Sequence, residues 1–160
     1  MTNIKDSITE KNLQISFANE SQARNKYTFF ASTAKKEGFE QISDIFLQTA
    51  NNEKEHAELF YKYLQGNDVK INFTFSSGWG NTLENLKLAA SGEHFEWSEL
   101  YKRFANIAKE EGFEEIAKTY REIAEVEKEL ANLPEVTLEF VRLQRNLKVK
   151  EKVFGILTEQ

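Results

Sequence analysis

The segment Glu53-Lys54-Glu55-His56 contains two side chains that could bind a metal ion. Glu53 and His56 are three residues apart, so on a helix they project from the same face. The other residues at helical spacing on that face are apolar, namely Ile42, Phe46, Ala50, Ala57, Phe60 and Leu64. A buried carboxylate and imidazole are costly unless something binds them, and in four-helix bundles an inward Glu-x-x-His pair is the usual half-site of a carboxylate-bridged two-metal centre.

Four further glutamates fall on predicted apolar stripes, namely Glu20, Glu93, Glu96 and Glu127. Carboxylates gathered in one core cannot all stay ionised without cations between them. A set of carboxylates with an imidazole suits iron or manganese, and zinc is a further candidate. Any one of these glutamates could instead lie on a solvated face, but together with Glu53 and His56 they predict a metal centre.

The composition excludes several other classes of protein. There is no cysteine, which excludes disulfides, thiolate metal sites and a cysteine nucleophile. The net charge of −5 argues against a nucleic-acid partner. No stretch approaches the apolar length of a membrane span, and residues 1–10 do not resemble a secretory signal, so a cytoplasmic location is expected. The 160 residues are enough for one domain with a real core.

Four long helices are predicted to position these residues, and they form an all-α fold. Their approximate ranges are 7–37, 39–65, 81–111 and 113 to about 130. Ser7 with Glu10, and Asn81 with Glu84, are helix-start patterns, while glycines follow the first and third helices. A further helical segment is expected over about 135–155, at the end of a single domain that spans residues 1–160.

Residues 66–81 form the one long segment that does not read as a helix. Ile71, Phe73 and Phe75 alternate with polar residues, which predicts an extended strip with one face against the protein. Neighbouring antiparallel helices need only a short loop, so this segment predicts a crossover along the length of the bundle. A bundle with one long crossover between its second and third helices is a ferritin-like four-helix bundle.

The chain also repeats itself at an interval of 74 residues, so two helical hairpins are expected. Glu53 and Glu127 are equivalent in this repeat, and so are Tyr27 and Tyr101. The repeat slips by one residue where Glu20 aligns with His94 rather than with Glu93. A one-residue π-bulge in one helix would absorb this slip.

Several segments resemble the rubrerythrin family: residues 17–24, 53–57, 82–86, 92–101 and 124–128. The likeness runs from about Thr9 to Glu129 and includes the flanking residues as well as the spacing. It implies a non-haem di-iron peroxidase that reduces hydrogen peroxide to water. It also implies an electron donor, usually a rubredoxin-like iron site held by four cysteines.

The resemblance assigns roles to eight residues of this sequence. Glu53 and Glu127 would bridge two irons, and Tyr27 and Tyr101 would lie near the site. Glu20 and Glu96 would bind one iron, with His56 taking part according to the redox state, and Glu93 would bind the other. Manganese or zinc could replace iron in such a carboxylate-rich site.

The sequence departs from the family pattern in three places. It has no cysteine and therefore no rubredoxin domain, so electrons must come from an external donor unless the chain is part of a longer protein. Leu130 stands where the family has its second ligand histidine, and His94, next to Glu93, should point about 100° away from it. Pro134 interrupts the expected fourth helix within 133–137.

Three functions remain open at this point. The favoured one is a di-iron peroxidase that uses an electron donor such as rubredoxin, with a role in oxidative-stress defence. The second is a ferritin-like iron-binding, ferroxidase or storage protein, which the weaker second site implied by Leu130 favours. The third is a dimeric scaffold with a decaying metal site, which the intact carboxylates oppose. The family likeness also implies a homodimer, with or without helices exchanged between chains.

Overall fold

A computed structural model of the chain describes residues 3–64, 66 and 68–131, with residues 129–131 described by their backbone alone. All the regular elements of the described part are helices, and it contains no strand. Its elements are α1 (Ile8–Lys36), α2 (Glu40–Tyr63), α3 (Thr82–Phe95), the π-helical turn η1 (Glu96–Leu100), α4 (Tyr101–Glu110) and α5 (Glu114–Ala131). The predicted all-α class is therefore confirmed. Within these residues, none of the helices has the length and apolar character needed to cross a membrane.

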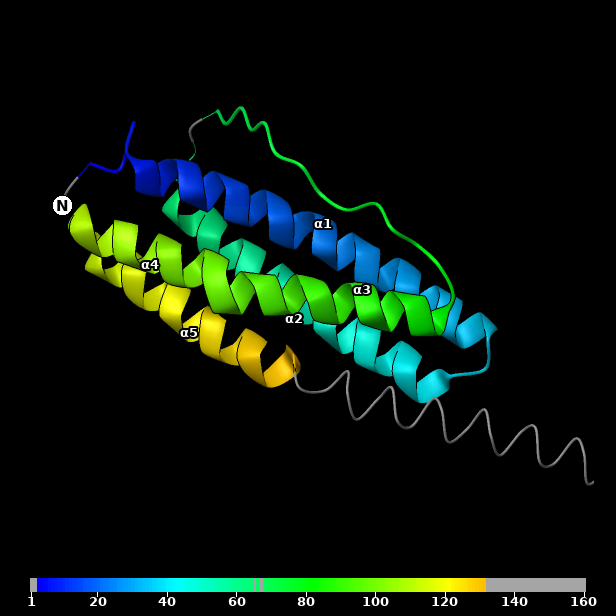
Figure 1. Ribbon diagram of the computed structural model, residues 1–160. Coiled ribbons are helices and arrows are strands. Elements are labelled where there is room, and N and C mark those ends of the chain that lie inside the picture. The colour runs from blue at the N-terminus through cyan, green and yellow to red at the C-terminus, as the bar shows by residue number, and fades with distance from the viewer. Residues whose placement is uncertain (1–2, 65, 67, 132–160) are drawn as a thin grey trace, which may run out of the picture.

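The helices form two hairpins that pack against each other. α1 packs along α2 in one hairpin, and α4 packs against α5 in the other. α3, η1 and α4 follow one another without a break, so they form the single third helix of a four-helix bundle (Figure 1). The segment after α2 then runs along the outside of the bundle to the start of α3, as the predicted crossover requires (Figure 1). The predicted segment 135–155 lies outside the described residues.

Side chains and glycines determine where the helices begin and end. The Ser7 hydroxyl accepts a hydrogen bond of 2.9 Å from the Glu10 amide, whereas the Glu10 carboxylate accepts from the Asp6 amide at 2.7 Å, so only half of the expected capping box forms. Asn81 begins α3 with the complete box, because both reciprocal hydrogen bonds are present. Glycines with a φ of 82° end α1 and α4, since this conformation is accessible to residues without a Cβ.

The hydrophobic core is divided into two clusters along the bundle. One cluster includes Leu13, Phe60 and Tyr120, and the other includes Tyr27 and Phe46. The predicted metal-binding glutamates come between these clusters along the helices, in the middle of the bundle. The two apolar clusters therefore hold the helices in place on both sides of a polar layer.

The crossover follows the predicted alternation over only part of its length. Ile71 and Phe73 are half-buried, and Asn72 between them is exposed. Phe75 was also predicted to face the protein, but 54% of it is exposed. The prediction was wrong at Phe75 because the crossover there stands away from the bundle and forms one wall of a pocket.

Candidate metal centre

Five of the predicted metal-binding residues come together in the middle of the bundle. Glu20 lies on α1, Glu53 and His56 on α2, Glu93 on α3 and Glu127 on α5. Their exposed fractions are 0% for Glu20, 1% for Glu53, 7% for His56, 5% for Glu93 and 0% for Glu127. Four carboxylates from four helices are therefore removed from water together, which is unfavourable without protons or cations between them.

These residues form two groups with the geometry of metal sites. The first group is Glu20, Glu53 and His56, and the second is Glu53, Glu93 and Glu127. Within each group, one ligand atom of each residue lies within 4.8 Å of those of the others. Glu53 belongs to both groups, so its carboxylate is placed to serve two metal ions at once.

The hydrogen bonding of the carboxylates fits a metal ion. Among the described residues, at least one oxygen of each carboxylate is buried without a hydrogen-bond partner, as at Oε2 of Glu20, Oε1 of Glu53, Oε2 of Glu93 and Oε2 of Glu127. A buried polar atom without a partner is rare in a native protein, and a metal ion bound between these oxygens would satisfy them. The residues present are oxygen and imidazole donors, which suit iron or manganese.

Two buried tyrosines connect the helices through these carboxylates. Tyr27 on α1 donates a hydrogen bond to Oε1 of Glu93, and Tyr101 on α4 donates one to Oε1 of Glu20. Burial first, and then the neighbouring carboxylates, raise the pKa of both phenols well above the usual range. Both hydroxyl groups therefore stay protonated and hold one oxygen of each carboxylate in a fixed direction.

His56 contacts both of the glutamates that the family likeness assigns as bridges. Its Nδ1 lies 2.8 Å from Oε1 of Glu127 and 3.3 Å from Oε2 of Glu53. Burial alone would lower the pKa of His56, but the hydrogen bond to Glu127 and the surrounding carboxylates raise it. The carboxylates around His56 therefore stabilise a positive charge on its imidazole.

The carboxyl groups of the centre differ in the direction of their pKa shifts. Burial, followed by repulsion from the other carboxylates, raises the pKa of Glu20, Glu53 and Glu93 well above the usual range. Burial also acts to raise the pKa of Glu127, but hydrogen bonds with Glu93 and His56 outweigh it and lower this pKa. Burial and mutual repulsion therefore favour the protonated form at Glu20, Glu53 and Glu93, whereas the contacts of Glu127 favour its ionised form.

The predicted π-bulge is confirmed. η1 begins at Glu96, directly after α3, and the widened turn adds one residue to the helix. As a result Glu93 is buried among the carboxylates, whereas its neighbour His94 is exposed and packs edge-on against Trp97, with ring centroids 5.1 Å apart. His94 belongs to neither group of candidate ligands, as its position beside Glu93 predicted.

Glu96 lies at the edge of the centre. It belongs to neither group of candidate ligands and is partly exposed. Burial and the charge of Glu127 raise the pKa of its carboxyl group to about 7. Glu96 is therefore close enough to interact electrostatically with the centre, and its assignment as a ligand stays a prediction.

Comparison with known proteins gives a consistent result. The family model described as Rubrerythrin matches residues 11–154. The chain belongs to the rubrerythrin family. It is 56% identical over 127 residues to a rubrerythrin of Porphyromonas gingivalis, which covers 79% of this chain and 64% of that relative. It is also 49% identical over 159 residues to a rubrerythrin of Clostridium perfringens, which covers 96% of this chain and 78% of that relative.

Two solved structures have the same fold as the described part of the chain. A structure of nigerythrin in its fully reduced, all-ferrous state superimposes with a TM-score of 0.75 at 29% identity, covering 87% of this chain and 72% of that one. Symerythrin from Cyanophora paradoxa has a TM-score of 0.75 at 24% identity, covering 86% of this chain and 89% of that one, and supports the fold alone. The ferritin-like bundle is thereby confirmed.

Two predicted departures from the family pattern fall outside the described residues, and one residue that acts on the centre was not predicted. The side chain of Leu130 and the stretch 133–137 lie outside the described residues, so both departures from the family pattern stay predictions. Lys26 was not predicted, although its ammonium group acts on the carboxyls of Glu53 and Glu96. Helical periodicity gave no signal for Lys26, because adjacent residues on a helix point about 100° apart and Lys26 therefore does not share the face of Tyr27.

Proposed function

We propose that the protein is a non-haem di-iron peroxidase, which reduces hydrogen peroxide to water with electrons from an external donor such as rubredoxin. The observation that carries this proposal is the pair of buried ligand groups that share Glu53. Membership of the rubrerythrin family supports it, as does the ferrous state of the nigerythrin structure. Defence against oxidative stress is the role that such an activity would serve.

In this proposal Glu53 and Glu127 would hold both irons. Glu20, Glu96 and His56 would hold one iron, and Glu93 would hold the other. Two ferrous ions held in this way would supply the two electrons needed to cleave the peroxide O–O bond without releasing a radical. The four buried carboxylates supply the negative charge that balances two dications. Manganese or zinc could occupy the same donors during purification.

The protein's own side chains would prepare this centre for reaction. Tyr27 and Tyr101 each fix one oxygen of a carboxylate, which leaves the other oxygen available to a metal ion. Outer hydrogen bonds of this kind orient metal ligands and strengthen binding. The aromatic cluster of Phe60, Tyr101 and Tyr120 lies beside Glu20 and excludes water from that side.

The proposed partners follow from the same reasoning. The 160 residues contain no cysteine, so the four-cysteine iron site that would deliver electrons must lie elsewhere, as in a separate rubredoxin. We also propose a homodimer in the cytoplasm, with or without exchanged helices, on the strength of the family likeness.

The alternative is a ferritin-like protein that oxidises or stores iron without reducing peroxide repeatedly. The specific observation in its favour is the sequence position of Leu130, which corresponds to His56 in the repeat and cannot supply a ligand atom. A second iron with one ligand fewer would bind less tightly, which suits iron in transit better than a permanent cofactor.

Peroxide turnover distinguishes the two functions. Iron-loaded protein should consume hydrogen peroxide repeatedly with reduced rubredoxin, at two electrons per peroxide, without accumulating iron. Glu53→Ala should lower this rate and the iron affinity by about a hundredfold or more, because Glu53 serves both groups. Glu58→Ala, an exposed glutamate on the same helix, is the matched control and should retain activity. Full activity of Glu53→Ala would exclude a di-iron peroxidase at this site.

A further inference from the structure

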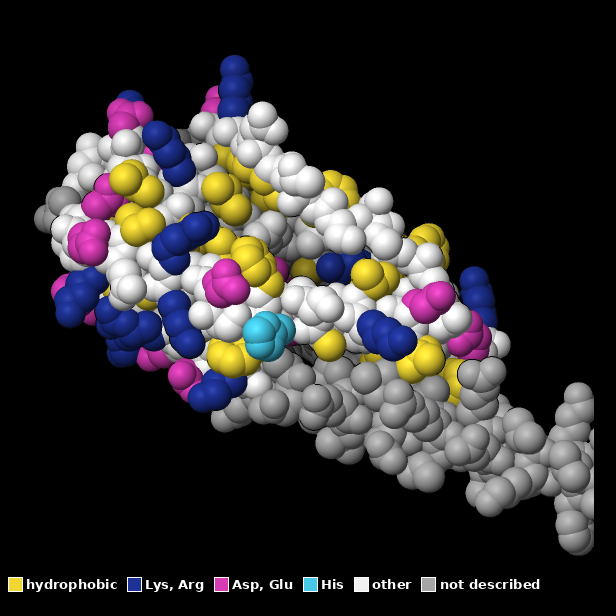
Figure 2. All heavy atoms as spheres, in the orientation of Figure 1, with side chains coloured by type: hydrophobic (Ala, Val, Ile, Leu, Met, Phe, Trp, Pro, Cys, Tyr) yellow, Lys and Arg dark blue, Asp and Glu magenta, His cyan; other side chains and the backbone are white. Residues whose placement is uncertain are grey.

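A pocket lies between α1 and the last part of the crossover, on the face of the bundle shown in Figure 2. Its volume is about 410 Å³, within the usual range for small-molecule sites. None of the described candidate metal ligands lines it. Phe30, which is buried, lines the pocket and packs against the buried Tyr27, with ring centroids 6.0 Å apart. The pocket is therefore a separate site, and these two rings lie between it and the metal centre.

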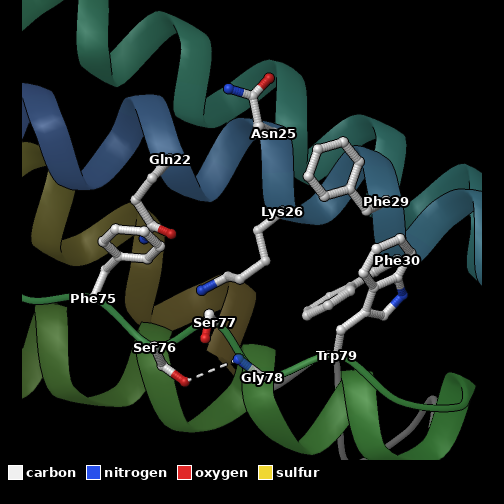
Figure 3. A pocket seen from close by; sticks show the side chains of 10 residues that line it. All are labelled: Gln22, Asn25, Lys26, Phe29, Phe30, Phe75, Ser76, Ser77, Gly78 and Trp79. Atoms are coloured by element: carbon white, nitrogen blue, oxygen red, sulfur yellow. Dashed lines mark hydrogen bonds between the residues drawn. The ribbon is translucent and has the colours of Figure 1, made fainter.

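Large aromatic side chains form most of the walls of the pocket. Phe29 and Trp79 stack with their ring centroids 5.6 Å apart, and Phe75 stands at the other end of the pocket (Figure 3). Phe29 is 49% exposed, Phe75 54% and Trp79 65%. Single exposed apolar residues are normal on a protein surface, but a group of large ones around a hollow marks a binding site. Aromatic walls favour a flat aromatic ligand, because rings stack or pack edge to face.

The wall formed by the crossover is tied to two helices, so the pocket is preformed. The indole Nε1 of Trp79 donates to the hydroxyl of Thr33 on α1 at 3.0 Å. Gly80 and Asn85, at the start of α3, exchange two hydrogen bonds of 2.9 and 3.0 Å. A preformed site loses less conformational entropy when a ligand binds than a site that must first become ordered.

Lys26 is the single charged side chain among the described residues that line the pocket. It extends from α1, and Figure 3 shows its amine directed toward the crossover near Ser77. Within the described part of the chain, no hydrogen bond or ion pair to this ammonium group is found, and none to the Ser77 hydroxyl. Both groups are therefore available to a ligand between the aromatic walls.

The charge of Lys26 limits the kind of ligand that fits. A neutral apolar compound would cover the ammonium group without giving it a partner, which is unfavourable. A compound with several negative charges would need more cations than the one that lines the pocket. A single carboxylate matches the single ammonium group, because each supplies one charge and a carboxylate accepts hydrogen bonds that the ammonium donates.

We propose that this pocket binds small aromatic monocarboxylates, compounds of one or two rings that carry one carboxylate. The rings would lie against the aromatic walls, and the carboxylate would accept hydrogen bonds from Lys26 and Ser77. This binding involves no electron transfer and no metal ion, so it stands or fails independently of the proposed peroxidase function.

The first test is titration calorimetry of the iron-loaded full chain with cinnamate and with its neutral analogue cinnamyl alcohol. The wild type should bind cinnamate about tenfold more tightly than the alcohol, because hydrogen bonds between charged groups are stronger than neutral ones. Lys26→Met should weaken cinnamate binding about tenfold and leave that of the alcohol within about twofold, and Lys26→Arg should restore it. Lys36→Met, at an exposed lysine of α1 outside the pocket, is the matched control.

The second test changes the walls. Phe75→Ala should weaken the binding of both compounds about tenfold, because a ligand loses several apolar contacts. Ser77→Phe fills the pocket and should abolish both. Saturating cinnamate should also raise the Tm of the wild type but not that of Ser77→Phe, since a ligand stabilises only the protein that binds it. Leu47→Ala, at an exposed apolar residue of α2 outside the pocket, is the control.

Three outcomes would overturn the inference. The first is the absence of saturable cinnamate binding to the wild type. The second is equal affinity of the wild type and Lys26→Met for cinnamate, and the third is binding that neither Phe75→Ala nor Ser77→Phe weakens. If the wild type binds no cinnamate and Phe75→Ala converts dimers into monomers in sedimentation, the aromatic walls belong to a contact between two copies of the chain.

Discussion

Glu37 and Glu111 occupy equivalent positions in the two halves of the chain, and each caps the start of a helix in the other half: Glu37 caps α3, and Glu111 caps α1. Glu37, at the end of α1, accepts a hydrogen bond of 3.0 Å from the Thr82 amide at the start of α3. Glu111, at the end of α4, accepts from the amides of Ile8 and Thr9 at the start of α1, at 3.0 and 2.8 Å. These carboxylates join the hairpins at both ends and so support the centre between them.

The first prediction concerns these caps. Glu111→Ala should lower the free energy of unfolding by about 2 kcal/mol, and Glu37→Ala by about 1 kcal/mol, because Glu111 accepts hydrogen bonds from two amides and a hydroxyl whereas Glu37 accepts one. Urea denaturation of the metal-free protein measures both. Glu110→Ala, at an exposed neighbour, is the control. Equal stability of Glu111→Ala and Glu110→Ala would show that the cap contributes nothing.

The second prediction concerns the stability of the metal-free protein as a function of pH. Folding raises the pKa of Glu20, Glu53 and Glu93 well above 4.5, and that of Glu96 to about 7. Above about pH 4.5 the folded protein therefore binds more protons than the unfolded chain, so its stability is greatest at mildly acidic pH and falls as pH rises through the folded pKa values. The lowered pKa of Glu127 changes the pH dependence of stability only below about pH 4.5, so it does not affect this trend.

Thermal unfolding of chelator-treated protein between about pH 5 and about pH 8 measures this effect, with Tm expected to fall. Iron-loaded protein should show a much weaker fall, because a bound cation keeps the carboxylates ionised. Glu96→Gln should reduce the slope below about pH 7, where that carboxyl titrates. A Tm of the metal-free protein that rises over this range would contradict the prediction.

The third prediction concerns the two buried tyrosines. Tyr101→Phe leaves Oε1 of Glu20 without its donor, and Tyr27→Phe does the same to Glu93. Each should weaken metal binding about tenfold, since ligands that lose an outer hydrogen bond are less well oriented. Titration calorimetry with Mn²⁺ measures the affinity. The control is Tyr63→Phe, whose hydroxyl pairs with Thr119 at 3.0 Å away from the centre, and an equal effect of all three changes would make the loss unspecific.

Much of the fold followed from local patterns in the sequence. The starts at Ser7 and Asn81 were predicted because a cap is formed by residues three positions apart. The π-turn at Glu96 was predicted from the one-residue slip in the repeat, since an inserted residue in a helix can be absorbed by one wider turn. Phe75 was the exception, because alternation shows that a segment is extended but not how far it stands from the helices beneath it.

The sequence by itself determined which residues form the candidate centre, because helical periodicity places Glu20, Glu53, His56, Glu93 and Glu127 on core-facing stripes. Only the tertiary structure decided how they pair: Tyr27 reaches the carboxylate on α3 and Tyr101 the one on α1, and the His56 imidazole contacts Glu127 on α5. The pocket lined by Lys26, Phe75 and Trp79 was decided in the same way. Contacts between distant segments depend on how whole helices pack, which no local pattern encodes.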